Sequence, residues 1–379
     1  HQELYNSALQ ERRDAWEKAR VTVSYNDQSA SLTELRQSGP EWIVANCSSE
    51  QVTLRRVSKA FDAFFRRCRA GAKEPGFPRF KALARMPGFG FKKHGDGWRF
   101  TPGTKFKNGW KHGSLRLQGV GTIKARGVAR TDGKIKSCEL MHKAGSWHLS
   151  LTVECETIER AMGNAAVGLD WGVETFAMLA HADGTWEPIK NPRLYRTHKA
   201  QEIELERIRD RRKRRSNRRH KATIRCARLK AKNARRRLDF HHKTTAKLVS
   251  RFALIATEKL EIAKMTRSAK GTVESLGKNV AQKTGLNREI LDTAPARFLT
   301  MLRTKAEEAR SLFMEAPTRK LKPSQTCPAC GAQKKKTLRE RMHQCDGCGH
   351  TEPRDAAAAR VCLNWALNEI NSREPCCAD

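Results

Sequence analysis

Long apolar runs are missing from this sequence. No eighteen consecutive apolar residues occur among its 379 positions, and a helix that spans a bilayer needs about that many. We therefore expect no membrane-spanning helix. No secretory signal is visible either, but the first residue is His1 rather than Met. The chain is accordingly expected to be truncated at its N-terminus.

A disulfide framework is also missing. Of the twelve cysteines, eight show no pairing pattern apart from the adjacent Cys376 and Cys377, and the other four are spaced like metal ligands. Such usage is typical of a reducing compartment and argues against a secreted scaffold. The sequence therefore predicts a cytoplasmic protein. No solenoid repeat is present.

Acidic residues are scarce relative to basic ones. Lys and Arg total 75 against 40 Asp and Glu, a formal net charge of +35. Self-repulsion of this size is unfavourable unless a polyanion offsets it, and nucleic acid is the usual polyanion. An anionic membrane surface fits less well, because the basic segments have no matching apolar stripe. A merely soluble basic protein is the plain alternative.

Acidic residues are scarcest between Asp210 and Asp239, where none occurs. A solvated helix normally alternates Glu and Lys four residues apart. Segment 211–237 instead favours a helical nucleic-acid surface over a solvated face or a disordered tail. The helix expected at 48–70 has a second basic face. The candidate contacts are Arg55, Arg56, Lys59, Arg211, Arg212, Lys213, Arg214, Arg215, Arg218, Arg219, Arg235, Arg236 and Arg237.

The expected elements change along the chain. Residues 1–72 are predicted to be helical, with Ser48 as a cap and one apolar stripe on the second long helix. Short strands from about 90 to 155, with turns at 132–133 and 144–145, predict a small barrel. Residues 166–180 read as one buried strand that the turn at 181–184 folds onto a second. The stripe comprises Val52, Val57, Ala60, Phe61, Phe64 and Phe65, and the later elements are helices at 200–250, 287–313 and 354–370 and a buried strand at 252–258.

Four cysteines predict a metal site. They form two C-x2-C-G knuckles, and four thiolates at this spacing suit tetrahedral Zn²⁺. A closed set of four ligands leaves no open position, so the zinc is expected to be structural. His343 and His350 lie nearby without being needed as ligands. The ligands are Cys327, Cys330, Cys345 and Cys348, and the insert offers further basic contacts in Lys334, Lys335, Lys336, Arg339 and Arg341.

Three acids lie where a carboxylate is costly or unexpected. Asp170 interrupts an apolar strand, Glu258 ends another, and Asp355 begins an Ala-rich helix. Singly, each has an ordinary explanation as a cap or a solvated strand end. Together they could hold two Mg²⁺ about 4 Å apart, the arrangement that hydrolyses phosphodiesters. Gly168 and Gly172 share the strand face of Asp170 and are expected to leave room for metal and phosphate.

The order of these motifs resembles TnpB, the RNA-guided nuclease of IS200/IS605-family transposons. The stretches GLDWGVETFAMLA, IATEKLEI and EPRDAAAARVCLNWAL, with the cysteine ribbon before the last, follow the order of the three RuvC motifs in that family. GFPRFKAL, MTRSAKG, GKNVAQKTGLNREILD and KPSQTCPACG are also similar. The resemblance covers nearly the whole chain. Compact type V CRISPR effectors share the plan and are the alternative.

The resemblance implies a multidomain α+β fold. It comprises a helical recognition domain, a β-barrel wedge domain and a RuvC domain of RNase-H-like α/β fold with an inserted zinc ribbon. The first barrel strand, expected before the helices, is missing, which also suggests truncation. The implied bounds are 1–85 for the recognition domain, 86–160 for the wedge, 161–325 for the first RuvC part including the basic region 200–250, 326–351 for the ribbon and 352–375 for the RuvC C-terminal helix.

The resemblance also implies an RNA-guided, Mg²⁺-dependent DNA endonuclease. Asp170, Glu258 and Asp355 match the family's catalytic acids and would hold two Mg²⁺. A structural zinc, a guide RNA from the transposon end and double-stranded target DNA complete the assembly, with a monomer favoured. Lys259 and Ala357 stand where the family often has Asp and Asn, which could weaken the outer shell of the site. The non-enzyme alternatives are a nuclease-inactive guided regulator and a guide-independent nucleic-acid-binding protein.

Overall fold

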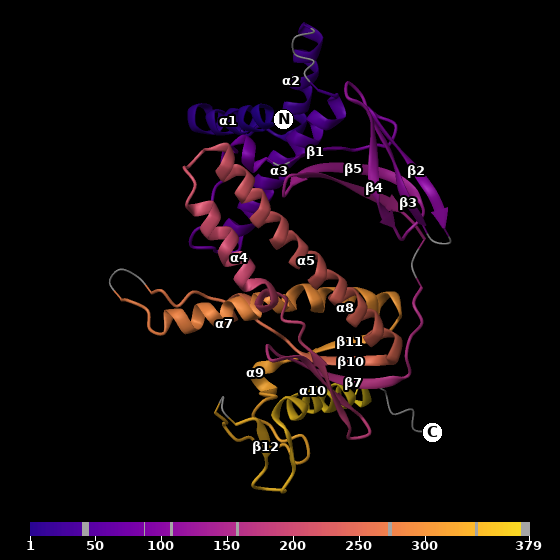
Figure 1. Cartoon of the computed structure of the whole chain (residues 1–379), viewed down its shortest axis with the longest axis vertical. Helices are drawn as coiled ribbons and strands as arrows, with labels where there is room; N and C mark the ends of the chain where they lie inside the picture. The colour runs from indigo at the N-terminus through magenta and orange to yellow at the C-terminus, as the bar shows by residue number, and fades with distance from the viewer. Residues whose placement is uncertain are drawn as a thin grey trace. The chain divides into compact units, whose positions relative to one another are not determined.

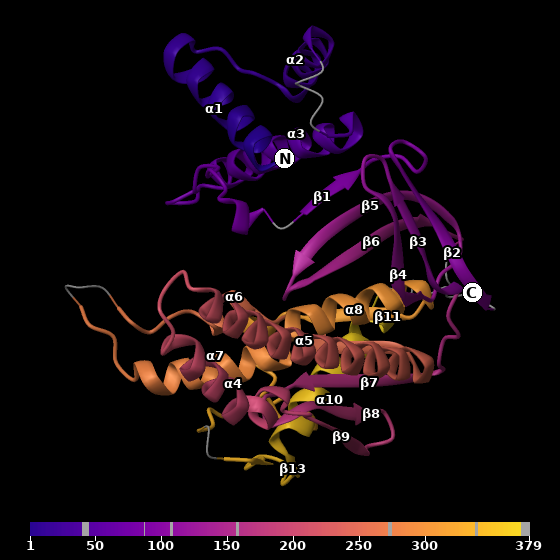
Figure 2. The same cartoon turned by 45° about the horizontal axis from the view of Figure 1, so that its top comes forward.

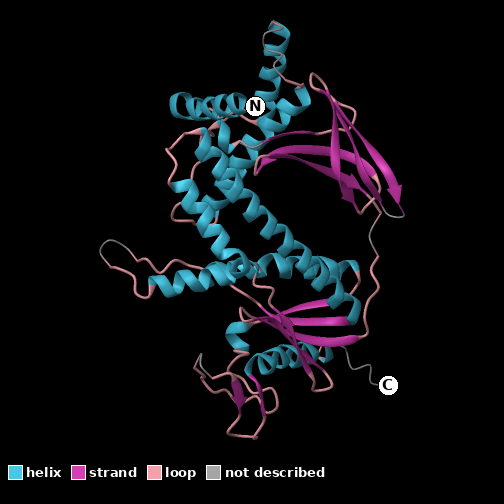
Figure 3. Cartoon of the chain, viewed as in Figure 1, coloured by secondary structure: helices cyan, strands magenta, loops and turns pink. Residues whose placement is uncertain are grey.

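Helices, then strands, then a mixed region follow one another along the chain in a computed structural model (Figure 1; Figure 3). The structure describes residues 1–39, 45–86, 88–106, 109–156, 159–271, 275–337 and 340–372. They form two units, His1–Glu156 and Thr157–Asp379, each with its own cores. Within the described ranges, no helix combines the length and the apolar character needed to cross a bilayer.

The first unit begins with a helical region, as predicted, and the structure divides it into three helices. Asn46, rather than the predicted Ser48, caps the third helix, and its side chain accepts a hydrogen bond from the Ser48 amide at 2.9 Å. The predicted apolar stripe is correct for Val57 but wrong for Phe65, which is 50% exposed because the buried face turns toward Thr53 and Leu54. The helices are α1 (Gln2–Ala19), α2 (Tyr25–Ser38) and α3 (Cys47–Arg69), followed by the short η2 (Leu83–Arg85).

Six strands complete the first unit. They form two three-stranded antiparallel sheets, β1-β5-β6 and β2-β3-β4, that share one apolar core around Trp98, Phe100 and Trp110. The predicted turn at 144–145 joins β5 to β6. In the described residues the two sheets are not joined into one hydrogen-bonded ladder, so the predicted barrel stays a prediction. The strands are β1 (Gly88–Phe91), β2 (Trp98–Phe106), β3 (Gly109–Leu117), β4 (Gly121–Ala129), β5 (Lys134–Lys143) and β6 (Ser146–Glu154).

A mixed five-stranded sheet organises the second unit, in the order β11-β10-β7-β8-β9. The first three strands in this order are parallel, and β7, β8 and β9 are antiparallel. The single strand predicted at 166–180 is wrong, since the chain turns at 172–174 and forms two strands. Residues 312–313, predicted as helix, lie in a strand. The strands are β7 (Ala165–Trp171), β8 (Thr175–His181), β9 (Trp186–Lys190), β10 (Phe252–Glu258) and β11 (Leu312–Ala316).

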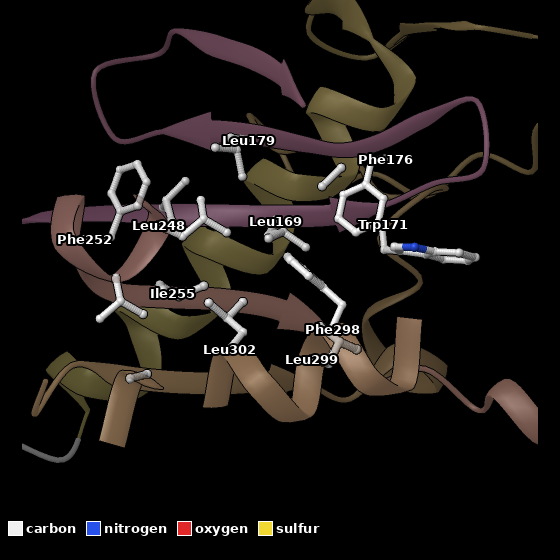
Figure 4. Packing of buried hydrophobic residues seen from close by; sticks show 14 of the residues in the cluster. Leu169, Trp171, Phe176, Leu179, Leu248, Phe252, Ile255, Phe298, Leu299 and Leu302 are labelled. Carbon is white, nitrogen blue, oxygen red and sulfur yellow. The ribbon is translucent and has the colours of Figure 1, made fainter. Parts of the chain in front are cut away.

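Helices cover both faces of this sheet. On one face Leu169 packs with Leu248 and with Phe298 and Leu302 (Figure 4). On the other, Leu254 packs against the last helix. The predicted basic helical region is a pair of contacting helices, α4 and α5, with a turn between them (Figure 2). The elements are α4 (Leu194–Asp210), α5 (Asn217–Arg251), α6 (Ile262–Met265), α7 (Val280–Thr293), α8 (Pro295–Glu308), α9 (Thr318–Leu321), α10 (Arg354–Asn371) and the ribbon strands β12 (Met342–Gln344) and β13 (Thr351–Pro353).

Gly168 sets how closely α10 approaches the sheet. A Cβ placed on Gly168 would lie 1.9 Å from the Ala359 carbonyl oxygen, far inside contact distance. The expectation that Gly168 leaves room for metal and phosphate is therefore wrong, because the space is filled by α10. Gly172 lies in the turn after β7, where a Cβ would lie 2.6 Å from the Thr175 carbonyl oxygen. Both glycines serve the packing of the fold.

Replacement of Gly168 by Ala is expected to destabilise the protein by about 1–3 kcal/mol, the usual cost of forcing atoms into a packed interior. Gly285→Ala is the matched control, because Gly285 lies in α7 and its added Cβ would meet nothing within 4 Å. That change should stabilise the protein by about 0.5–1 kcal/mol, since Ala is the better helix former. Urea unfolding of both variants measures the difference. Equal stability of the two would disprove the close contact.

Candidate functional site

Two of the three predicted acids lie at one edge of the second unit's sheet. Strands β7 and β10 run parallel, and Leu169 lies opposite Thr257. The next residues along the two strands are Asp170 and Glu258. Because neighbouring parallel strands keep their register, the two carboxylates project from adjacent strand ends. The sheet therefore brings together acids that are 88 positions apart in the sequence.

The third acid, Asp355, reaches the same edge through the contact at Gly168. Ala359 of α10 touches the sheet there, and Asp355 lies one turn earlier on the same helix face, about 6 Å along the axis. Asp170 lies two residues beyond Gly168 on the same strand face, about 6.6 Å away. The two spacings match. The charge of Asp355 accordingly acts on Asp170.

Burial and mutual repulsion disfavour the ionised form of these acids. Loss of water raises the pKa of Asp170 well above its usual range, and the charges of Glu258 and then Asp355 raise it further. Burial also raises the pKa of Glu258. The neighbouring Arg354 acts in the opposite direction on the Asp170 pKa. All three acid side chains keep intermediate exposure, so a cation could reach them and relieve the repulsion.

The three carboxylates are more widely spaced than ligands around one bound metal ion. Among the residues that the structure describes, only the four predicted cysteines form a group of three or more candidate ligands whose atoms all lie within 4.8 Å of one another. The acids share an edge and an electrostatic field but do not meet that limit. Their donor chemistry, hard carboxylate oxygen, nevertheless suits Mg²⁺, which usually keeps several waters between itself and the protein.

Two neighbours of the acids were not predicted from the sequence. Cys362 of α10 is 1% exposed, and burial followed by the charges of Asp170 and Glu258 raises the pKa of its thiol well above normal. Arg354 donates from its guanidinium to the Thr337 carbonyl at 2.9 Å. Its adjacency to Asp355 in the sequence was an available signal. The place of Cys362 beside the acids had no such signal, since its sequence neighbours Val361 and Leu363 indicate only an apolar stretch.

The four cysteines converge as predicted. The sulfur atoms of Cys327 and Cys348 lie 3.7 Å apart, and those of Cys330 and Cys345 lie 3.5 Å apart. These separations match the edge of a tetrahedron with Zn–S bonds of about 2.3 Å, which is about 3.8 Å. Backbone amides of Cys348 and then Gly347 lower the pKa of Cys345 to about 6. That sulfur is therefore a ready anionic ligand at neutral pH.

The two knuckles of the ribbon have the same backbone form. Gly331 and Gly349, which follow the second cysteine of each knuckle, have φ of 77° and 71°. This left-handed conformation favours glycine. Each of these glycines donates from its amide to the carbonyl of the knuckle's first cysteine, at 3.0 Å in both cases. The C-x2-C-G pattern thus builds two equal turns that aim sulfur at one point.

The ribbon is fastened to the elements that carry the acids. Asn364 of α10 donates to the Pro328 carbonyl at 2.9 Å. Arg360 pairs with the buried Glu352 of β13 at 3.1 Å and donates to the Gly184 carbonyl at 2.7 Å. His350, which was not needed as a ligand, lies 3.0 Å from the same Glu352. Ribbon and sheet therefore share one charged contact.

The predicted basic contacts in the second unit fall into two groups. Arg219 donates to the carbonyls of Arg209 and Arg212 and pairs with Asp210 at 3.1 Å, so it holds the turn between α4 and α5. Arg237 pairs with the buried Asp292 at 2.5 Å, and Arg236 contacts His198. These three have partners within the fold. The other members, all exposed, are Arg211, Arg212, Lys213, Arg214, Arg215, Arg218 and Arg235.

The remaining predicted contacts are similarly divided. In the first unit Arg55 lies over the Tyr25 ring, Arg56 donates to the Gly88 carbonyl, and Lys59 is exposed. In the ribbon, Lys334 pairs with Asp346, Lys336 contacts His343, and Arg341 pairs with Glu174. Lys335 is exposed. Arg339, with Cys376 and Cys377, lies outside the described residues. Contact with nucleic acid stays a prediction for all of these positions.

Asp170→Asn is expected to raise the unfolding temperature of the metal-free protein at pH 7. Because the folded-state pKa of Asp170 is raised, its ionised form destabilises the fold above the ordinary Asp pKa. The advantage of Asn should shrink as the pH falls toward about 4, because the folded-state acid is then protonated and the unfolded-state acid is becoming protonated. The measurement is thermal unfolding in chelator from pH 4 to 8.

Asp239→Asn is the matched control for this change. Asp239 is an exposed acid of α5 that pairs with Lys243 at 2.6 Å, so its replacement should change the stability by less than about 0.5 kcal/mol at any of these pH values. If Asp170→Asn instead lowers the unfolding temperature at pH 7, the ionised form of Asp170 does not destabilise the fold.

Comparison with known protein families gives two matches. The OrfB_IS605 family, described as "Probable transposase", matches residues 150–269. A second family, described as "Cas12f1-like, TNB domain", matches residues 296–362. The first range contains β7, β8 and β10 with Asp170 and Glu258, and the second contains the four cysteines and Asp355.

Curated proteins match over nearly the whole length. "Putative RNA-guided DNA endonuclease InsQ" of Escherichia coli (strain K12) is 28% identical over 365 residues, which cover 95% of this chain and 85% of that protein. "Putative RNA-guided DNA endonuclease" of Streptomyces pristinaespiralis is 29% identical over 372 residues, 96% of this chain and 83% of that protein.

Among solved structures, a chain in the cryo-EM structure of the Cas12f1-sgRNA-target DNA complex aligns with a TM-score of 0.57. The alignment covers 96% of this chain and 80% of that one at 13% identity, so it shows a shared multidomain α+β fold. The resemblance predicted from the motifs is confirmed: this chain contains a region that matches the OrfB_IS605 family and a Cas12f1-like TNB region, and over nearly its whole length it is similar to proteins named as putative RNA-guided DNA endonucleases.

Proposed function

We propose that the chain is an RNA-guided DNA endonuclease whose active site is the edge formed by Asp170, Glu258 and Asp355. The observation that carries the proposal is the convergence of three partly buried, mutually repelling acids in a chain of net charge +35. Acids held in this way against a cationic background are typical of a divalent metal site that acts on a polyanion. The names of the related proteins support the same activity.

The proposed domains follow from the elements of each unit. Helices α1–α3 support the assignment of residues 1–85 to recognition, and strands β1–β6 that of residues 86–160 to the wedge. The mixed sheet with helices on both faces supports a RuvC domain of RNase-H-like fold for residues 161–325, completed by 352–375. Residues 326–351 are then the inserted zinc ribbon. Guide RNA, double-stranded target DNA and a prokaryotic cytoplasmic site of action belong to the same proposal.

The chain's own residues would prepare the site for hydrolysis. Asp170 and Glu258 offer carboxylate oxygens from fixed strand ends, and Asp355 offers one from the first turn of α10. Mg²⁺, when bound, activates the attacking water and stabilises charge on the leaving oxygen. Arg354 adds a positive group beside Asp170 that would attract the phosphate. Ala357 is 1% exposed and apolar, so it offers no hydrogen bond to orient these ligands.

The cleavage experiment uses the ribonucleoprotein purified with its own RNA. A plasmid library with randomised flanks beside the guide-matched sequence is incubated with Mg²⁺ and sequenced for cuts. Asp170→Ala should lower the cleavage rate at least about 100-fold, because a metal ligand is lost. Asp239→Ala, which removes an exposed acid of α5, should leave the rate within about twofold.

Three outcomes would overturn the proposal. Equal cleavage by wild type and Asp170→Ala would show that these acids are not part of the active site. Target binding by the wild-type complex without cleavage at any Mg²⁺ concentration would favour the nuclease-inactive regulator. Copurified RNA of mixed sequence would favour a guide-independent nucleic-acid-binding protein, whereas one defined RNA supports the guided enzyme.

The four cysteines are proposed to hold one structural Zn²⁺. Cys345→Ser should reduce the zinc content, measured by atomic absorption, from about one ion per chain to well below half, because three ligands bind far more weakly than four. Cys68→Ser is the control, since Cys68 is an exposed cysteine of α3 outside the cluster. Full zinc retention in Cys345→Ser would contradict the site.

A further inference from the structure

A groove runs along the flank of α8 that faces α5. It has a volume of about 560 Å³, and residues of α8 spaced four apart, including Arg297 and Lys305, line one side. His242 of α5 and Arg160, from the segment before β7, also line the groove. Figure 2 shows α5 and α8 lying side by side. Nothing in the proposed cleavage site uses this groove.

Lys305 is a buried cation without an anionic partner. Its residue is 7% exposed, and its ammonium donates to two neutral oxygens, the His242 carbonyl at 2.7 Å and the Thr245 hydroxyl at 2.8 Å. Burial and then Arg160 lower its pKa, and Glu308 acts against them without reversing the shift. A buried charge is costly unless an opposite charge is supplied. None of the described carboxylates forms an ion pair with Lys305, and Glu308, whose charge acts on it, is paired with Arg160.

The only carboxylate that lines the groove is already engaged. Glu308 pairs with Arg160, so these two charges largely cancel. Arg297 is exposed and forms no ion pair among the described residues. The groove therefore keeps two uncompensated cations, Arg297 and Lys305. They lie eight residues apart on one helix, about 12 Å along its axis, which suits a chain of anionic groups better than a single small ion.

The groove lies away from the three acids. Helix α8 covers the sheet face where Phe298 and Leu302 pack, whereas α10 with Asp355 covers the opposite face. Strand β11 follows α8 directly, and its first residue, Leu312, lies opposite Leu254 near the start of β10. Glu258 is at the far end of β10. The Lys305 end of the groove is thus at the opposite edge of the sheet.

We propose that this groove binds the phosphodiester backbone of a nucleic acid, with Arg297 and Lys305 facing separate phosphates. The arginine guanidinium can donate two parallel hydrogen bonds to a phosphate. The lysine ammonium has one hydrogen left after its two neutral contacts. RNA and DNA share this chemistry, and the experiment separates them. The proposal concerns binding alone and does not rest on hydrolysis at Asp170.

The test compares Arg297→Ala with Arg303→Ala in the full chain. Arg303 lies on the same helix outside the groove and pairs with Glu315 at 2.6 Å, so its loss is a matched loss of charge. Binding of a labelled single-stranded RNA and a labelled DNA duplex is followed by fluorescence anisotropy over a salt series. Binding is measured without Mg²⁺ to keep it separate from cleavage.

Arg297→Ala should weaken binding of one probe by about five- to eightfold at 0.1 M salt and reduce its salt slope by about 0.7 for the single strand or 0.9 for the duplex. The probe that responds identifies the nucleic acid. Arg297→Glu should weaken it further. Arg303→Ala should bind like wild type. The proposal is overturned if Arg297→Ala matches Arg303→Ala with both probes.

Discussion

The close approach of α10 to β7 is the constraint on which the candidate site depends. Only a residue without a side chain fits at Gly168 under the Ala359 carbonyl. From that contact, the helical turn back to Asp355 and the two strand residues on to Asp170 cover almost the same length. Asp355 therefore lies beside Asp170. The ribbon is attached to the same helix through Asn364. A single backbone contact therefore positions an acid, and the helix that carries this acid also holds the cysteine ribbon.

The same contact also brings the three acids close enough to repel one another. Three acids at one sheet edge raise the pKa of Asp170 through lost hydration and mutual repulsion, and a nearby thiol, Cys362, stays protonated. The fold tolerates this because the sheet and α10 bury enough apolar surface around the edge to hold the acids in place. Cations are what such a cluster lacks. The ribbon shows the corresponding arrangement with soft ligands, where amides already favour the Cys345 thiolate.

The sequence predicted the local elements well and their contacts poorly. The strand ending at Glu258 and the helix beginning near Asp355 followed from hydrophobic patterning and are present. The role of Gly168 was misread, because period-two alternation identifies a face but not what covers it. Residues 312–313 were assigned to a helix since the charged pattern before them runs on without a breaker. Strand pairing with β10, about 58 positions away, decides their structure instead.

Charge composition likewise predicted a polyanion partner but not where it binds. The acid-free run from 211 to 237 looked uniformly available, yet Arg237 is neutralised by Asp292 from another helix, and Lys230 pairs with Glu202 and Glu206 of α4. Acids distant in sequence supply the partners that the run itself lacks. A binding surface is therefore defined by cations left without such partners. Arg297 and Lys305 do not belong to a basic run of the sequence. By that criterion they are nevertheless as strong candidates for nucleic-acid contact as the arginines of the α4–α5 turn.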